Sequence, residues 1–385
     1  MWYTDLRPDE ELNTNRYFLV MLDKYHNYAR LLDNEGKQRT IKGLLQLKEG
    51  LLNKVPPKGV DKNLLLASWN IKNFGRLKDR TAESLFYIAE IINAFDIVAL
   101  QEINGDLDHF DKIMSLLGSD WKYTISDVTE GSVGNEERFG FVYDSRRVTH
   151  SGLSGELVIP DEFITANPII KQLKRTPTFT GFESGWKKFS IVSLHLHPGD
   201  GANDPGEPTD KEIRKEEVRL LMQLLELKLN RSSFEERNLI VLGDTNLYEE
   251  DEDIVELMND KGFFESDGLK GKYTNTSLNQ IYDRIFLHVD KYFKIGIDEN
   301  GQERGGVFKL FDYVYQNTPD AISKYHELML SHKDDPSTLT SDEAFQSYFN
   351  RYWKRNQISD HLPVWLEIET DSTQSFLKNK LEALE

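Results

Sequence analysis

Short apolar runs that end in polar residues recur along this chain, and they limit the folds that it can adopt. Residues 64–71 read LLLASWNI, residues 96–103 read DIVALQEI, and residues 238–244 read NLIVLGD. Short runs rich in apolar and β-branched side chains are typical of buried strands. Further runs of this kind lie at residues 138–144, 189–197, 282–289 and 363–368. We therefore expect a core of β-sheet.

Helical periodicity is found between these runs. Thr81 is expected to cap the first of the helices, with Glu83 in its first turn, and Gly118 is expected to end the second. Because strands alternate with helices but some strands also follow one another as in hairpins, the pattern favours a layered α/β sandwich over a regular βαβ series. The predicted helices span residues 81–95, 107–118, 211–230 and 251–259.

Three segments lie outside this core pattern. Residues 1–60 contain two stretches of helical periodicity and are expected to form an N-terminal helical extension. Residues 300–356 are mostly helical in pattern and are expected to be an insertion before the last core strand. The core domain would then span residues 64–370, and residues 371–385 would form a helical tail.

Composition argues against several classes of protein. The chain has 385 residues, a net charge of −18 and no cysteine. Disulfides, thiolate nucleophiles and cysteine metal sites are therefore excluded, and a general basic surface for nucleic acid is absent. No apolar run approaches the length of a membrane span, and the acidic N-terminus is unlike a signal peptide. We expect a soluble, cytoplasmic protein with no membrane partner, and the oligomeric state is left open.

Polar residues cluster where the predicted strands begin or end. Strands in a packed sheet bring their ends to a common edge, where the sites of α/β proteins often form. Burying several carboxylates, histidines and asparagines together is costly unless they serve a function. The residues at these positions are Asn70, Glu102, His195, Asp244, Asn246, Asp283, Asp360 and His361.

Each of these residues also has a purely structural interpretation when it is taken alone. Asp244 follows Gly243 and suits a turn or a helix cap, and Glu102 and Asn70 suit turns as well. A histidine in an apolar strand, such as His195, is more often a hydrogen-bonded core residue than a catalyst. Their joint occurrence is what favours a functional site.

The residue types at this edge suit hydrolysis of a phosphate ester. Oxygen atoms of Glu102, Asp360 and Asn70 are the hard donors that Mg²⁺ or Mn²⁺ prefers. Histidines with carboxylate partners suit proton transfer, and Asp244 with Asn246 can orient a water molecule and contact an oxyanion. The chain has no serine or cysteine nucleophile motif and no glycine-rich phosphate loop. The sequence thus predicts metal-assisted attack of water on a phosphate ester.

Seven motifs occur in order along the chain: SWNIKNF, ALQEI, EERFGFVYD, SLHLH, GDTN, YDRIF and SDHLPV. In this order they resemble the motifs of the endonuclease/exonuclease/phosphatase superfamily, with the closest resemblance to type I deoxyribonuclease. The resemblance covers roughly residues 64–295 and 357–369. It implies a four-layer α/β sandwich of two packed mixed β-sheets flanked by helices, and Mg²⁺-dependent hydrolysis of phosphodiesters or phosphomonoesters.

The resemblance also implies roles in proton transfer. By position, His361 matches the general base for the attacking water, and Asp283 matches the aspartate that orients it. His195 matches a second histidine, and Glu137 matches its carboxylate partner. This second pair would protonate the leaving oxygen.

Further matches concern the metal ion and the phosphate. Glu102 matches the metal-binding glutamate and Asn70 the asparagine beside it, while Asp360 matches a carboxylate on the metal side. Asp244 and Asn246 match residues that bind the phosphate and position the water.

Basic residues near the motifs are candidates for substrate contact. Lys72 stands where the deoxyribonuclease has an arginine near the scissile phosphate; it contacts the phosphate as a point charge or is a solvated lysine at a strand end. Arg355 closes a mixed aromatic and basic segment, residues 351–355, of the kind that often binds single strands. With Asn70 and Asn246, these two residues are the predicted phosphate contacts.

Two departures from the deoxyribonuclease pattern concern DNA binding. The positions of an arginine and a tyrosine that engage the minor groove are occupied by Asn104 and Asn135 here. A basic contact and a stacking contact are therefore missing. The change weakens the case for duplex DNA but leaves the hydrolytic residues in place.

These observations predict a divalent-metal-dependent phosphodiester hydrolase, a nuclease that acts on DNA or RNA. The alternative is a phosphatase or phosphodiesterase on a small or lipid-linked phosphate, similar to a sphingomyelinase or an inositol-phosphate hydrolase. A non-enzymatic scaffold is disfavoured, because every matched catalytic position is intact. The substrate, endonuclease or exonuclease action, and the number of metal ions are left open.

Overall fold

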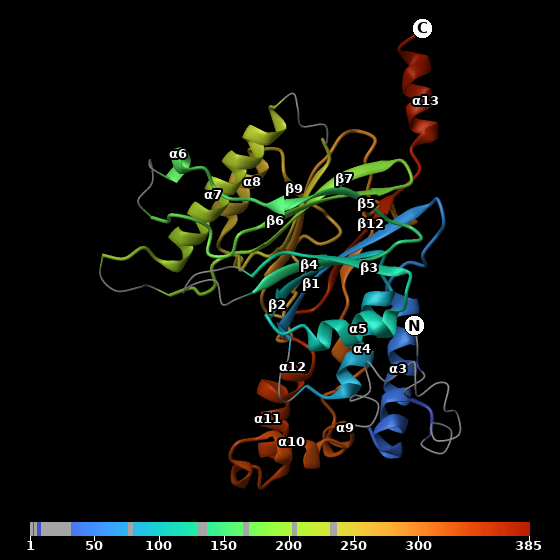
Figure 1. Ribbon diagram of the computed structural model, residues 1–385, viewed down its shortest axis with the longest axis vertical. Helices are drawn as coiled ribbons and strands as arrows, with labels where there is room; N and C mark the ends of the chain where they lie inside the picture. The colour runs from blue at the N-terminus through green and yellow to red at the C-terminus, as the bar shows by residue number, and fades with distance from the viewer. Residues whose placement is uncertain are drawn as a thin grey trace.

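Two six-stranded mixed β-sheets pack face to face, and helices flank them (Figure 1). The structure is a computed structural model that describes residues 3, 6–8, 32–75, 80–128, 137–164, 169–201, 206–231 and 237–385. The arrangement confirms the predicted α/β sandwich of two packed sheets between layers of helices.

The first sheet contains the first two predicted strands and the last. Within it β1 and β2 run parallel, and the other neighbouring strands run antiparallel. Its order is β11 (Gly305–Val307), β12 (Val364–Glu369), β1 (Asn63–Phe74), β2 (Ile97–Ile103), β4 (Arg138–Asp144) and β3 (Trp121–Ile125).

The second sheet is also mixed. Its one parallel pair among the described strands is β7 with β8, and its remaining neighbours are antiparallel. Its order is β5 (Thr149–Glu156), β6 (Thr178–Ser184), β7 (Lys187–His195), β8 (Leu239–Asp244), β10 (Asp283–His288) and β9 (Phe264–Glu265).

Burial on both faces explains why the strands are continuous apolar runs. In β1, Leu64 and Leu66 pack into the layer between the two sheets, whereas Leu65 and Trp69 pack toward the helices. A strand that is covered on both faces has no solvent side on which polar residues would alternate.

Helices cover the outer face of each sheet (Figure 1). Thr81 stands at the N-cap position of α4 as predicted, but its side chain makes no capping hydrogen bond. The helix α5 ends before Gly118 as predicted, and the φ of 95° at this residue suits glycine. The first sheet is covered by α3 (Asn34–Lys54), α4 (Ala82–Asn93) and α5 (Asp108–Leu117), and the second by α7 (Asp210–Leu229) and α8 (Glu252–Asn259). A short helix, α6 (Asp161–Ile164), follows β5.

The segment between β10 and β12 is mostly helical, as its pattern indicates. It also contains the short strand β11, for which its sequence has no strand pattern. This strand is three residues long and begins with two glycines. A Cβ atom on Gly305 would lie 2.5 Å from the Leu366 side chain of β12, which would have to move. Its helices are α9 (Pro319–Ser323), α10 (His326–His332), α11 (Asp342–Tyr348), a π-helical turn (Phe349–Trp353) and α12 (Lys354–Gln357), with short 3₁₀ turns at Leu310–Asp312 and Pro336–Thr338.

The two ends of the chain add helices to this core. The predicted helical stretch at residues 40–52 lies within α3, whereas the stretch at residues 16–32 lies almost entirely outside the described residues. At the other end, α13 (Thr373–Glu382) projects away from the sheets (Figure 1). No helix in the described ranges has both the length and the hydropathy needed to cross a membrane.

Candidate active site

Three neighbouring strands of the second sheet bring polar side chains to one edge. The pairing register places His195 of β7 and Asp283 of β10 on either side of Asp244, the last residue of β8. Since β7 and β8 are parallel, both end at this edge, and the antiparallel β10 begins there. All three side chains are buried.

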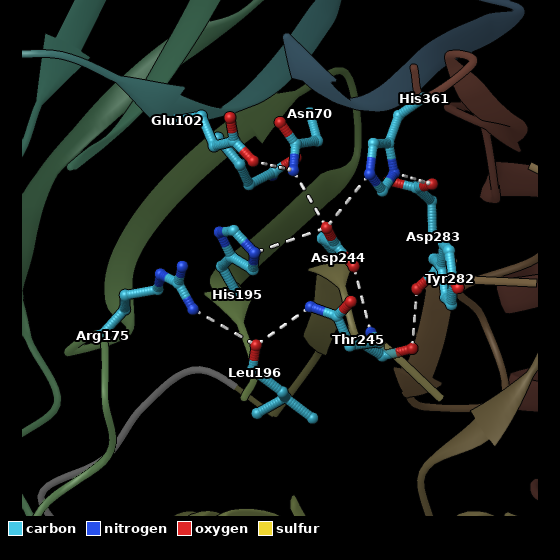
Figure 2. Close-up of polar contacts among 12 residues, drawn as sticks. Asn70, Glu102, Arg175, His195, Leu196, Asp244, Thr245, Tyr282, Asp283 and His361 are labelled. Atoms are coloured by element: carbon cyan, nitrogen blue, oxygen red, sulfur yellow. Dashed lines mark hydrogen bonds and ion pairs between the residues drawn. The ribbon is translucent and has the colours of Figure 1, made fainter. Parts of the chain in front are cut away.

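His361 reaches the same edge from the segment that precedes β12. Its Nδ1 atom lies 2.8 Å from Oδ2 of Asp283, and its Nε2 atom lies 3.5 Å from Oδ2 of Asp244 (Figure 2). One carboxylate therefore orients the ring, and the opposite ring nitrogen faces a second carboxylate.

The second histidine has a matching arrangement. His195 Nδ1 lies 3.1 Å from Oε2 of Glu137, and its Nε2 lies 3.4 Å from Oδ2 of Asp244. The two imidazoles thus approach the same carboxylate oxygen of Asp244 through their Nε2 atoms (Figure 2). Each ring is held at Nδ1 by a carboxylate of its own.

A buried arginine fixes the carboxylate behind His195. Arg175 donates from Nε to Oε2 of Glu137 at 2.8 Å and from Nη2 to Oε1 at 3.2 Å. Burial opposes the ionised carboxylate, but the hydrogen bonds and charges of His195 and Arg175 outweigh it and lower the pKa of Glu137 to about 2. In the sequence, no feature separates Arg175 from the other basic residues around it.

Asp244 links this histidine pair to the first sheet. Asn70 Nδ2, at the end of β1, donates to Asp244 Oδ2 at 2.9 Å, and the Asn246 backbone N–H donates to Asp244 Oδ1 at 3.0 Å. The Asn246 side-chain amide donates to the Leu196 carbonyl at 3.0 Å.

The charges at this point shift two pKa values in opposite directions. Burial opposes ionisation of Asp244, but the charges of His361 and His195 outweigh it and lower the pKa of this carboxyl. Burial likewise opposes protonation of His361, but the negative charges of Asp283 and Asp244 outweigh it and raise the pKa of the imidazole. The pairing therefore stabilises an imidazolium next to a carboxylate.

Asn70 and Glu102 bring oxygen donors together at the ends of β1 and β2. Asn70 Nδ2 and the Asn73 backbone N–H each donate to the Glu102 carboxylate at 2.9 Å. The backbone is in the left-handed region at Asn73, Glu102 and Asn246, with φ of 44°, 58° and 48°. Non-glycine residues in this conformation are strained and are often found at functional sites.

These donors fit a hydrated Mg²⁺ ion. Asn70 Oδ1 is buried and has no hydrogen-bond partner, and it lies on the side chain that contacts Glu102. Among the described residues no group of three or more histidine, aspartate or glutamate side chains could hold a metal ion. Mg²⁺ commonly binds through one or two carboxylates and keeps water and phosphate oxygens as its other ligands, so one carboxylate and one amide oxygen are sufficient.

The other predicted contacts lie close by but are less tightly held. Lys72 Nζ is 3.9 Å from Oδ2 of Asp360, and both side chains are about one third exposed, at 30% and 36%. Arg355 donates from Nη2 to Ser277 Oγ at 2.9 Å. Neither basic side chain contacts the two histidines.

Asn104 and Asn135 occupy the positions of the two minor-groove contacts of the deoxyribonuclease, and only Asn104 lies among the described residues. Asn104 directly follows β2, and its backbone N–H donates to the Phe74 carbonyl. Asn135 lies outside the described residues.

Ser359 supports the site through its hydrogen bonds and is not among the predicted site residues. Its buried hydroxyl donates a hydrogen bond to the Asn70 carbonyl at 2.7 Å. The same hydroxyl accepts hydrogen bonds from the backbone N–H groups of Lys72 and His361, at 3.2 and 3.0 Å. Trp69 Nε1 donates to the His361 carbonyl at 3.1 Å. The only signal in the sequence is that a small polar residue precedes the Asp360–His361 pair.

The chain belongs to the endonuclease/exonuclease/phosphatase family, whose model matches residues 67–361. It is 29% identical over 167 residues to bovine deoxyribonuclease-1, which covers 41% of this chain and 55% of the relative. It is 30% identical over 147 residues to human deoxyribonuclease-1, covering 36% of this chain and 50% of the relative. The chain thus spans about half the length of these curated relatives.

Solved structures support the fold. A Bacteroides thetaiotaomicron protein of the same family superposes with a TM-score of 0.50 at 17% identity, covering 80% of this chain and 98% of that one. The sequence match therefore establishes the family, and the α/β sandwich is supported by both the sequence match and the structural superposition. Proteins of this family are phosphoester hydrolases.

Proposed function

We propose that this protein hydrolyses phosphodiester bonds, with nucleic acid as its substrate and Mg²⁺ or Mn²⁺ as its cofactor. The observation that supports this most is the pair of histidines around Asp244: each Nδ1 contacts its own carboxylate, and both Nε2 atoms face the same oxygen. Two oriented imidazoles at one point are suited to serve as base and acid in a single displacement.

In the proposed reaction neutral His361 is the general base. The carboxylates beside it raise the pKa of its imidazole, and a cation held at Asn70, which contacts Asp244, would oppose that shift and favour the neutral ring. The Nε2 atom of His361 accepts a proton from the attacking water, whose oxygen forms the new bond to phosphorus. Asp283 holds the ring through Nδ1 and stabilises the imidazolium that results. As the new bond forms, the bond from phosphorus to the leaving oxygen breaks.

His195 is the proposed general acid for the leaving oxygen. Glu137 orients its ring through Nδ1, and Arg175 helps to keep Glu137 ionised. The Nε2 atom of His195 would give its proton to the leaving oxygen. Asp244 and Asn246 are proposed to orient the water and the phosphate between the two rings.

Glu102 and Asn70, with Asp360 nearby, are the residues that would hold the metal ion. When bound, the ion neutralises charge that develops on the phosphate. The unpartnered oxygen of Asn70 and the carboxylate of Glu102 supply the donors. Lys72 and Arg355, with Asn70 and Asn246, are the proposed phosphate contacts.

The preference for nucleic acid is supported by the similarity to two deoxyribonucleases. One observation favours the alternative, a phosphatase or phosphodiesterase on a small or lipid-linked phosphate. The net charge of −18 and Asn104 in place of a basic residue both weaken attraction to a polyanion.

We also propose a division of the chain and a location. Residues 64–370 would form the catalytic domain, with a specificity-determining insertion at residues 300–356, an extension at residues 1–60 and a tail at residues 371–385. A chain without cysteine is compatible with the reducing cytoplasm.

A substrate panel tests this proposal. Double-stranded DNA, single-stranded DNA, RNA and bis(p-nitrophenyl) phosphate are incubated with Mg²⁺ and either the wild type or His361→Ala. We expect cleavage of at least one nucleic acid that falls steeply as salt rises, disappears in excess chelator and is lost in His361→Ala. Cleavage of the small ester alone, independent of salt, would favour the alternative, and full turnover in chelator would exclude the metal.

A further inference from the structure

Arg80 is a buried arginine that is not matched to any motif of the site. It directly precedes Thr81, the N-cap residue of α4, and is 5% exposed. Its Nη2 donates to the Lys72 carbonyl at 2.7 Å and to the Ile358 carbonyl at 3.1 Å, and its Nε donates to the Gln357 carbonyl at 3.2 Å. All of these acceptors are main-chain oxygens.

The hydrogen bonds that hold the charge of this arginine go to main-chain carbonyls and not to a carboxylate. Among the described residues no carboxylate forms an ion pair with Arg80, and its Nη1 is buried without a partner. Burial lowers the pKa of the guanidinium to about 9, with the charge of Glu102 acting against this, so the group stays cationic at neutral pH. A buried charge without an ion pair normally costs stability, which indicates that the residue has another use.

The hydrogen bonds of Arg80 join the two segments that carry the proposed site. Lys72 lies near the end of β1, two residues after Asn70, and Ile358 directly precedes Ser359. Ser359 connects the same two segments, because its hydroxyl forms hydrogen bonds with the main chain of Asn70 and Lys72. Arg80 therefore acts as a second and independent connection between residues 70–74 and residues 357–361.

The same connection extends to the helical insertion. Gln357 is the last residue of α12 and is fully buried. Its Oε1 accepts hydrogen bonds from the Thr81 backbone N–H at 2.9 Å and from Ser84 Oγ at 3.0 Å. The end of the insertion is thus tied to the start of α4 at the point where Arg80 ties it to β1.

We propose that Arg80 is a positioning residue for phosphodiester hydrolysis: it clamps the Lys72 segment to the Gln357–His361 segment and so sets Lys72 and Asp360 relative to His361. This inference rests on the proposed function. It predicts that loss of Arg80 mainly slows the chemical step, because a displacement of about 1 Å in a catalytic group can cost on the order of 100-fold in rate.

The test compares Arg80→Met and Arg80→Lys with a matched control, Arg147→Met. Arg147 also donates to main-chain carbonyls, at Asn63 and Gly59, but at the opposite end of β1, and it is paired with Asp96. Activity is measured with Mg²⁺ and bis(p-nitrophenyl) phosphate, stability by urea unfolding, and local order by amide hydrogen exchange.

For Arg80→Met we expect kcat to fall on the order of 100-fold with KM changed less than about threefold. Arg80→Lys keeps the charge but cannot bridge three carbonyls, so we expect its kcat to fall about tenfold. Arg147→Met should lose stability while kcat of the folded protein stays within about twofold. If kcat of Arg80→Met is unchanged, or falls only as far as that of Arg147→Met, the clamp is overturned.

Hydrogen exchange separates this inference from the proposed function. In Arg80→Met the peptides that contain residues 70–74 and 357–361 should exchange about tenfold faster, whatever reaction the protein catalyses. If Arg80→Met is too unstable to assay, Arg80→Lys gives the same readout. Unchanged hydrogen exchange in both segments would overturn the proposed role of Arg80. A wild-type protein that cleaves none of the substrates in the panel would overturn the proposed function alone.

Discussion

His361 Nδ1 lies 2.8 Å from Oδ2 of Asp283, although the two residues are 78 positions apart in the chain. Asp283 begins β10 in the second sheet, and His361 precedes β12 in the first sheet. The hydrogen bond therefore joins the edges of the two sheets and turns the opposite ring nitrogen toward Asp244.

We expect His361→Ala and Asp283→Asn to lower kcat by a similar factor, on the order of 10² to 10⁴. The reason is that the aspartate acts only through the ring that it orients. In the double variant the loss should equal that of His361→Ala, because two residues that act as one unit are not additive. Steady-state kinetics of the three variants provide the measurement, and multiplicative losses would contradict the pairing.

Glu102→Gln should weaken metal binding and turnover together. The substitution keeps the shape of the side chain and removes its charge, so we expect Mg²⁺ affinity to fall at least about tenfold. Calorimetric titration of Mg²⁺ gives the affinity without relying on activity. Glu183→Gln, an exposed glutamate of β6 that is paired with Lys188, is the control and should bind Mg²⁺ like the wild type; equal affinity in Glu102→Gln would remove this residue from the metal site.

The depressed pKa of Glu137 predicts a loss of stability in acid. Its pKa falls from an ordinary 4.5 to about 2 in the folded protein, so its contribution is complete above about pH 4.5 and declines as the pH falls toward 2. Between about pH 6 and pH 3 this group alone should remove about 2 kcal/mol of the free energy of unfolding. Urea unfolding at the two pH values measures the change.

Glu137→Gln should lose that part of the pH dependence, because the amide does not titrate. Glu226 is exposed on the outer helix α7, so Glu226→Gln serves as the comparison and should keep the pH dependence of the wild type. An identical acid loss in wild type and Glu137→Gln would show that the carboxylate is not stabilised by Arg175 and His195 as described.

Gly243→Ala should destabilise the fold. Gly243 has a φ of 135°, and a Cβ atom there would collide with the Leu194 carbonyl oxygen of the neighbouring strand. We expect a loss of at least about 2 kcal/mol, because neither the backbone conformation nor the neighbour can adjust easily. Gly155→Ala, at an exposed position of β5 with nothing within 4 Å, should change stability by less than about 0.5 kcal/mol; thermal unfolding of both variants checks this, and equal midpoints would refute the collision.

Much of the core fold follows from local pattern. The strands β1, β2, β4, β7, β8, β10 and β12 and the helices α4, α5, α7 and α8 lie where their periodicity places them. Strands β3, β5, β6, β9 and β11 were not predicted, because they are short, polar or rich in glycine. The stability of such strands depends on a neighbour in the sheet rather than on their own composition.

For the candidate site, the sequence by itself determined the chemistry that is available: carboxylates, histidines and asparagines at the ends of apolar strands, in the motif order of a known family. The resemblance also pairs His361 with Asp283 and His195 with Glu137. The contacts around these two pairs are visible only in the tertiary structure. Arg175 is buried against Glu137, Arg80 donates to the Lys72 carbonyl, and both histidines face the same oxygen of Asp244. Such contacts depend on strand register and on segments far apart in sequence, and local pattern carries no information about either.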